Sequence, residues 1–143
     1  MNIREMTLED LDQVMAIEKE NFSVPWTENG FFSFLIRQDT LFLVAEDETG
    51  IAGYCGIVMV PDEGDITNVS VAGNRRRQGI GAGLVRELIR RAGEAGVTKI
   101  YLEVRESNRA AIALYEKLGF RREGLRRDYY EEPRENAVLM SRK

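Results

Sequence analysis

The sequence predicts an α/β fold over residues 1–143: a mixed, mostly antiparallel sheet with a central parallel pair and helices on both faces. A chain of 143 residues has the length of one domain. Alternating and amphipathic stretches follow one another in the order βααβββαβαββ. In the middle, a strand, a glycine-rich loop, a helix and a second strand imply a parallel pair joined by a right-handed crossover.

In the first half of the chain, polar residues mark where the helices begin. Thr7 opens "TLED", a capping box with Asp10 in the place where Glu is more usual, so a helix is predicted from there to about Asn21. A second, shorter helix is predicted within residues 25–38, with Thr27 as its cap. Strands are predicted at residues 2–6, 41–47, 51–60 and 64–71.

In the second half, a strongly amphipathic helix follows the glycines and ends at Gly96. Its apolar stripe consists of Ile80, Leu84, Val85, Leu88, Ile89 and Ala92. Residues 99–104 alternate apolar and polar side chains, which predicts a strand. A helix over residues 108–120 closes at Gly119, and a last hairpin turns around Pro133, with strands at 120–130 and 135–142.

The composition excludes several kinds of chemistry. The chain has no histidine, so serine–histidine and cysteine–histidine catalysis and HExxH zinc sites are excluded, and no metal is expected. Its one cysteine, Cys55, lies in an apolar run and is predicted to be a core residue. With a net charge of −4, no membrane-spanning run and no signal peptide, we expect a cytoplasmic protein that binds neither membrane nor nucleic acid directly.

The segment "NRRRQGIGAGLVRELI" places three glycines at a helix start, where unpaired N–H groups and the helix dipole attract anions. A P-loop requires a lysine after the glycines, and none is present. A dinucleotide site needs a third glycine where Leu84 stands, although Glu103 lies at the distance of a ribose-binding acid. Arg76, Gly79 and Gly81 do fit the pattern [QR]-x-x-G-x-[GA]. The alternative to an anion-binding site is that the glycines only form a tight turn and that the arginines are a solvated run of charges.

That pattern is typical of the GCN5-related N-acetyltransferases (GNATs), which this chain resembles along nearly its whole length. The segments "FSVPWTENGF", "ITNVSV", "RRQGIGAGL", "LEVRESNRAAIALYEKLGF" and "RRDYYEEPRENAVLMSR" are similar to those of the RimI-type N-terminal acetyltransferases. The resemblance implies the GNAT fold, acetyl-coenzyme A as co-substrate, and the N-terminal alanine of a small-subunit ribosomal protein as acceptor.

The resemblance also implies a role for particular residues. Glu103 would be the proton acceptor, Tyr115 the proton donor, and Tyr130 part of the peptide entrance. The strand edge at residues 69–71 would pair with the pantetheine arm, and Asn108 would contact the cofactor. The complete set implied for the cofactor is Val69, Ser70, Val71, Arg77, Gln78, Gly79, Ile80, Gly81, Ala82 and Asn108.

The chemistry of amide formation fits these residue types. An α-amine has a pKa of about 7.7–8.0, so a carboxylate must remove its proton before it attacks a thioester. By pattern alone, Glu103 fits a surface glutamate paired with an arginine equally well, and Tyr115 fits a core tyrosine. Two other functions stay open at this stage: acetylation of another N-terminus, a lysine or a small amine, and a non-catalytic acyl-coenzyme A sensor.

Overall fold

The computed structural model describes residues 1–76 and 78–143, and its elements follow the predicted order. A short 3-10 turn, Leu8–Asp10, precedes α1, and a second one, Gly73–Arg75, follows β4. The helices are α1 Leu11–Asn21, α2 Glu28–Leu35, α3 Ile80–Glu94 and α4 Arg109–Lys117. The strands are β1 Asn2–Glu5, β2 Thr40–Asp47, β3 Gly50–Val60, β4 Glu63–Val71, β5 Lys99–Arg105, β6 Arg121–Glu131 and β7 Arg134–Arg142.

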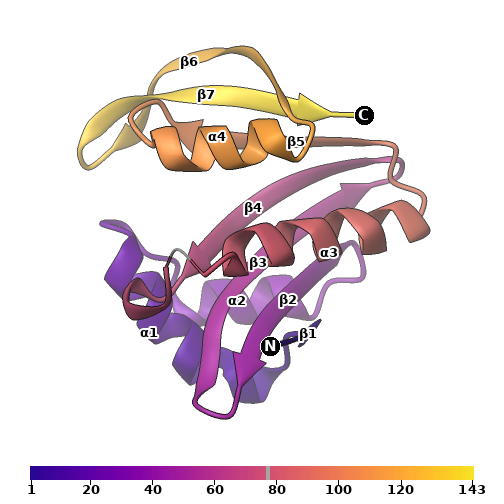
Figure 1. The fold of residues 1–143 in the computed structure, drawn as a ribbon, viewed down its shortest axis with the longest axis vertical. Coiled ribbons are helices and arrows are strands. Elements are labelled where there is room, and N and C mark those ends of the chain that lie inside the picture. Colours follow the sequence, from indigo (N-terminus) through magenta and orange to yellow (C-terminus); the bar gives the residue numbers. More distant parts are fainter. Residues whose placement is uncertain (77) are drawn as a thin grey trace.

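All seven strands form one sheet in the order β1-β2-β3-β4-β5-β7-β6 (Figure 1). Only β4 and β5 run parallel, and every other neighbouring pair is antiparallel. The helix α3 makes the crossover between the two parallel strands, as the sequence predicts. The mixed sheet with a central parallel pair is therefore confirmed.

Helices cover both faces of the sheet, and each face has its own hydrophobic core. One core joins α3 and α4 to the strands through residues such as Leu84, Leu88 and Ile112. The other joins α1 and α2 to the opposite face through residues such as Val14 and Phe31. Figure 1 shows α3 in front of the sheet and α2 behind it. Within the described residues, no helix is long and apolar enough to cross a membrane.

The predicted cap and turn residues adopt the expected geometry. Thr7 and Asp10 form the capping box, with the Thr7 N–H donating to Asp10 Oδ2 at 2.8 Å. The hydroxyl of Thr27 accepts from the N–H of Gly30 at 3.0 Å at the start of α2. Gly96 has φ +98°, a left-handed conformation in which glycine carries no steric penalty. Local sequence therefore fixes these ends of the helices.

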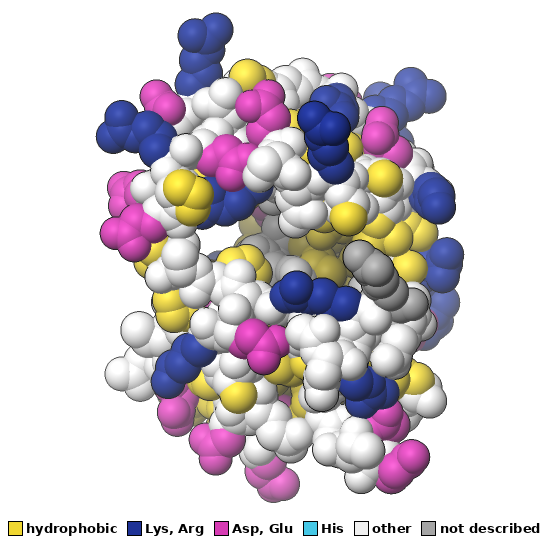
Figure 2. Space-filling model, turned by 60° about the vertical axis from the view of Figure 1, so that its left-hand side comes forward, with side chains coloured by type: hydrophobic (Ala, Val, Ile, Leu, Met, Phe, Trp, Pro, Cys, Tyr) yellow, Lys and Arg dark blue, Asp and Glu magenta, His cyan; other side chains and the backbone are white. Residues whose placement is uncertain are grey.

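The sheet opens into a fork in its middle. Strands β4 and β5 pair over only three residue pairs, Glu63–Lys99, Gly64–Ile100 and Asp65–Tyr101. Beyond them, β4 continues to Val71 alongside β3, while β5 continues to Arg105 alongside β7. The two strands separate in Figure 1, and Figure 2 shows a hollow between the two parts of the molecule with hydrophobic side chains inside it. The fork places one edge of β4 next to this hollow.

Candidate active site

The open edge of β4 offers backbone groups to a ligand. The N–H of Ala72 donates to the carbonyl of Ala52 at 2.8 Å, so the alternation of an antiparallel ladder turns the polar groups of Val69 and Val71 away from β3. They point into the fork, where β5 no longer pairs. Within the described chain, the N–H and C=O of Val69 and the N–H of Val71 have no strand partner. This edge could pair with an extended amide chain.

The register between β3 and β4 shifts next to this edge. Gly56 pairs with Asn68 and Ile57 pairs with Ile66, so Thr67 is an extra residue of β4 with no partner on β3. An extra residue of this kind bends a strand and increases its twist. The bulge therefore helps β4 to turn away from β5. Thr67 interrupts the apolar pattern of the strand in the sequence, and the bulge is the structural counterpart of that interruption.

The N-terminus of α3 forms a small cradle at the end of the fork. Gly79 is the N-cap residue, with φ +78°, and supplies no side chain to the first N–H groups of the helix. A Cβ on Gly81 would meet only Val71 Cγ2 at 3.7 Å and Leu114 Cδ2 at 3.8 Å, so packing within the protein does not require a glycine there. A hollow of about 200 Å³ is lined by Val71, Arg75, Arg76, Gly79, Ile80, Gly81, Ala82 and Leu114. Bare N–H groups beside open space suit a pyrophosphate.

Five of the predicted cofactor residues line this hollow: Val71, Gly79, Ile80, Gly81 and Ala82. Gln78 is exposed beside it, and its amide oxygen accepts from Arg75 Nε at 3.3 Å. Arg77 lies outside the described residues. Leu84, the residue that spoils a dinucleotide pattern, is fully buried, and its Cδ1 lies 3.2 Å from where a Cβ on Gly53 would be. Where α3 packs on the sheet at this point, the small residue is Gly53 of β3 and not a glycine of the helix.

The two described arginines of the loop are held by neighbouring side chains. Arg75 forms an ion pair with Asp47, and its Nη1 lies 3.1 Å from the Thr49 hydroxyl. This arginine holds the pKa of the Asp47 carboxyl well below its usual range, and the Thr49 hydrogen bonds lower it further. Arg76 donates to Asn21 Oδ1. Both guanidinium groups border the cradle, so they place positive charge next to it without being freely solvated.

The side chain of Ser70 points away from the fork. Ser70 is buried, and its hydroxyl accepts from Asn21 Nδ2. The same Nδ2 donates to the carbonyl of Val71 at 2.8 Å. Asn21, at the end of α1, therefore holds the last two residues of β4 in place. No feature of the sequence marks Asn21 for this position.

Glu103 lies on β5, two residues past the last pair of the fork. Its side chain is 17% exposed, on the face opposite the buried Ile100, Leu102 and Val104. Arg126 Nε lies 3.2 Å from Glu103 Oε2, but no described group forms a hydrogen bond with that buried oxygen. A carboxylate with an unused acceptor oxygen beside an open strand edge can take a proton from an amine.

Tyr115 lies on α4 with only 7% exposure, and its ring meets Phe120 edge-on at 5.7 Å between centroids. Burial raises the pKa of its hydroxyl above the ordinary value, and the neighbouring Cys55 and Tyr130 add to this rise. The hydroxyl has no hydrogen-bond partner in the described part of the chain. A phenol in this setting keeps its proton at neutral pH and can donate it in a hydrogen bond.

Asn108 and Cys55 have structural roles. The Asn108 side-chain oxygen caps α4 by accepting from the N–H of Ala111 at 3.2 Å, which leaves its amide NH₂ to face solvent or a ligand. Cys55 is fully buried, and burial raises the pKa of its thiol. The prediction that Cys55 is a core residue is confirmed.

Three residues near Glu103 come from outside the predicted set: Asp65, Arg126 and Tyr129. Burial raises the pKa of Tyr129, and the Glu103 carboxylate adds to the rise. Burial also raises the pKa of Tyr130 to about 12, and the nearby Tyr129 and Glu103 contribute. In the sequence, only the alternation of charged and apolar residues around Asp65 indicates that its side chain lies on the exposed face of a strand. Arg126 and Tyr129 lie in the family-like segment "RRDYYEEPRENAVLMSR", but several charged and aromatic residues stand side by side there, and the pattern alone does not single out these two.

A buried glutamate organises the loop between α1 and α2. Glu18 is 2% exposed, accepts from the N–H of Trp26 at 2.8 Å, and also accepts from the Tyr54 hydroxyl. Trp26 then stacks on Phe34 with 4.8 Å between ring centroids. Ser23, in the same loop, donates to the carbonyl of Glu132 in the β6–β7 turn. The loop and the turn therefore meet across one end of the fork.

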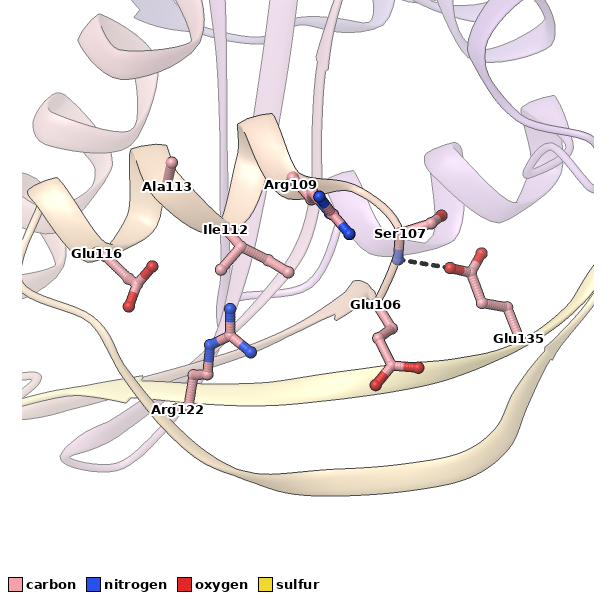
Figure 3. Close-up of a pocket in the computed structure, with 8 residues that line it drawn as sticks. All are labelled: Glu106, Ser107, Arg109, Ile112, Ala113, Glu116, Arg122 and Glu135. Carbon is pink, nitrogen blue, oxygen red and sulfur yellow. Dashed lines mark hydrogen bonds between the residues drawn. The ribbon is translucent and has the colours of Figure 1, made fainter.

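A larger cavity, of about 750 Å³, lies between α4 and the β6–β7 hairpin (Figure 3). Charges of both signs line it, including Arg109, Arg122 and Glu116. The N–H of Ser107 donates to Glu135 Oε2 at 2.6 Å at one end. None of the predicted site residues lines this cavity, so the fork is the better candidate despite the smaller volume of its cradle.

Comparison with known proteins identifies the class of the chain. The model of the acetyltransferase (GNAT) family matches residues 11–120. A protein of Escherichia coli K12, named [ribosomal protein bS18]-alanine N-acetyltransferase, is 37% identical over 134 residues, covering 92% of this chain and 90% of that protein. A Salmonella typhimurium protein of the same name is 38% identical over 135 residues, with the same coverage of both chains.

Solved structures agree with this result. The crystal structure of the ribosomal-protein-S18-alanine N-acetyltransferase from Escherichia coli has a TM-score of 0.91 and 35% identity, covering 99% of this chain and 92% of that one. Ard1 from Thermoplasma volcanium has a TM-score of 0.90 and 25% identity, covering 99% of this chain and 95% of that one.

The chain belongs to the acetyltransferase (GNAT) family. It is an N-acetyltransferase of the RimI type, so the resemblance drawn from the sequence motifs is confirmed. GNAT enzymes take their acetyl group from acetyl-coenzyme A.

Proposed function

We propose that this enzyme acetylates the N-terminal alanine of ribosomal protein bS18. The names of relatives that match most of both chains at 37% and 38% identity support this acceptor. The structural observation that carries the proposal is the position of Glu103: a partly buried carboxylate lies beside the open edge of β4, at the fork where the parallel strands separate. The proposed reaction joins the α-amine to an acetyl group there.

The acetyl donor fits the fork and the cradle. Its pantetheine arm is an extended chain with two amides, and the open groups of Val69 and Val71 would pair with it. The pyrophosphate would lie at the N-terminus of α3, on the N–H groups of residues 78–82, with Arg77 and the NH₂ of Asn108 as further contacts. Bound acetyl-coenzyme A supplies an activated acetyl thioester to the site.

The protein's own groups would handle the protons. Glu103 accepts a proton from the incoming α-amine, so that the nitrogen lone pair is free to attack. Tyr115 donates a hydrogen bond to the departing sulfur, since burial keeps its hydroxyl protonated. General acid–base assistance of this kind contributes about 10²–10⁴-fold. Direct attack requires no nucleophilic side chain, in agreement with a chain that has no histidine.

The experiment is an acetylation assay with a mass readout. Purified enzyme and acetyl-coenzyme A are incubated with four acceptors: the alanine-initiated bS18 peptide, the same peptide with its α-amine blocked, a peptide with another first residue, and a polyamine. We expect one acetyl group on the first peptide and none on the blocked one. An unchanged bS18 peptide together with an acetylated polyamine would show that the acceptor is a small amine.

A further inference from the structure

Asp65 lies at the apex of the β4–β5 fork. It pairs with Tyr101 in the last of the three residue pairs that join the parallel strands. Directly paired residues project from the same face of a sheet, and so do residues two apart on one strand. Asp65, Tyr101 and Glu103 therefore share one face, with Asp65 diagonally next to Glu103. The fork brings two carboxylates to the mouth of the candidate site.

The two carboxylates are close enough to affect each other. Desolvation raises the pKa of Asp65 although the residue is exposed, the charge of Glu103 raises it further, and Arg126 lowers it. From β6, Tyr129 also faces this group, with its ring 5.9 Å from Arg126 Cζ. From β5, the Tyr101 hydroxyl lies 3.4 Å from Glu63 Oε2. Among the described residues, Arg126 is the cation that acts on both Asp65 and Glu103.

Both carboxylates have unused acceptor capacity. The Asp65 side chain makes no hydrogen bond or ion pair with any residue that the structure describes. No described donor is aligned with the buried Oε2 of Glu103 either. Arg126 is 56% exposed on an edge strand, so it can move away at low cost. With both carboxylates ionised, Arg126 balances only one of their two negative charges. The pair can therefore attract a cationic ligand.

We propose that Asp65 is a positioning residue of the acceptor site: with Glu103 it receives the ammonium group of the incoming chain, which displaces Arg126 from Glu103. This inference rests on the proposed function, because an α-amine with a pKa of about 7.7–8.0 arrives largely as an ammonium. An ammonium has three N–H donors, enough to bind both carboxylates at once. Asp65 orients the amine, and Glu103 is left to accept its proton.

The test compares Asp65→Asn with Glu63→Gln, which removes a carboxylate from the same face of β4 but outside the pair. Peptide binding is measured by calorimetry on the enzyme saturated with coenzyme A, so that no turnover occurs. The probes are the bS18 peptide and its analogue with the α-amine replaced by hydrogen. Wild type and Glu63→Gln should favour the amine, and Asp65→Asn should lose roughly fivefold of that preference.

Two results would overturn the inference: an unchanged preference in Asp65→Asn, or an equal loss of affinity for both probes, which would indicate a structural role. The same comparison with alaninamide and propionamide tests the acceptor site even where bS18 is not the acceptor. Acetylation of bS18 by the wild type separately tests the proposed function.

A second measurement follows the Asp65 carboxyl by NMR. Its pKa should fall in Glu103→Gln, which removes a neighbouring negative charge, and should rise in Arg126→Gln. Arg126→Gln should also bind the amine probe more tightly, because the competing cation is gone. Weaker binding of the amine by Arg126→Gln would exclude displacement.

Discussion

Asn21 donates from Nδ2 to the carbonyl oxygen of Val71 at 2.8 Å, and so joins the last turn of α1 to the end of β4. The same amide group donates to the Ser70 hydroxyl, and its oxygen accepts from Arg76. One side chain therefore connects the helix, the strand edge and the loop before α3. Its position makes it a support for the donor site.

Asn21→Ala should weaken donor binding. Without the amide, the end of β4 and Arg76 lose their shared anchor, so we expect the KM for acetyl-coenzyme A to rise roughly tenfold. The free energy of unfolding should fall by about 1–2 kcal/mol, because partly buried hydrogen bonds are lost. Lys19→Ala, on an exposed position of the same helix, is the control and should change neither value. Steady-state kinetics and urea unfolding check both.

Glu103→Gln should lower kcat by about 10²–10⁴-fold, since the amide cannot accept the proton of the amine. The KM for acetyl-coenzyme A should stay within twofold of the wild-type value. Glu63→Gln is the matched control and should keep its activity. Full turnover by Glu103→Gln would remove Glu103 from the mechanism.

Gly81→Ala and Gly93→Ala separate helix stability from donor binding. Both glycines are in α3, and a Cβ at either one meets no close contact in the protein. Each alanine should stabilise the helix, by up to about 1 kcal/mol for the interior Gly93. Only Gly81→Ala places a methyl group in the cradle, so only this variant should lose affinity for coenzyme A. Thermal denaturation and calorimetry with coenzyme A give the two readouts, and equal affinities would contradict the cradle.

Tyr54→Phe should destabilise the protein by about 1–3 kcal/mol, because the buried Glu18 carboxylate loses a donor. Desolvation, followed by the Glu18 carboxylate, holds the pKa of Tyr54 well above its ordinary value. The loop that carries Trp26 depends on the same carboxylate, so hydrogen exchange should rise around residues 22–27. Unaltered exchange in this loop would show that Glu18 holds Trp26 without Tyr54.

The Arg4–Asp10 pair should make stability depend on acid. Arg4 donates to both Asp10 oxygens, at 2.8 and 2.9 Å, and holds the pKa of that carboxyl below its ordinary value. A lowered pKa in the folded state contributes stability above the unfolded value of about 3.9, and this is lost as pH falls through the folded value. Asp10→Asn should be less stable than wild type at pH 7, and the difference should shrink below about pH 4. A constant difference in urea unfolding would contradict the linkage.

Much of the fold could be predicted from the sequence because the signals are local. Gly79 and Gly96 adopt the left-handed backbone that favours glycine, and Thr27 caps its helix. The stripe from Ile80 to Ala92 forms part of a core, as its periodicity predicts. The family motifs added the candidate residues of the site, and the structure brings the cradle residues together.

The fork could not be predicted, because it depends on where two strands stop pairing rather than on the residues of either one. Asp65 reads as an ordinary charged residue on a half-buried strand, and only its register with Tyr101 places it near Glu103. Asn21 and Val71 are 50 residues apart, so their contact leaves no local pattern. Arg126 reaches Glu103 across β7, and this contact depends on the register of β7 with both β5 and β6.

The short join at the fork also divides the molecule mechanically. Strands β1–β4 and β5–β7 form two lobes whose sheets are connected by three rungs at one end. A donor lying between β4 and β5 would act as a missing strand and tie the open ends together. The bound donor would then join the two halves of the sheet. The two lobes would be held most rigidly with acetyl-coenzyme A bound, and each release of coenzyme A would let them move relative to one another before the next cycle.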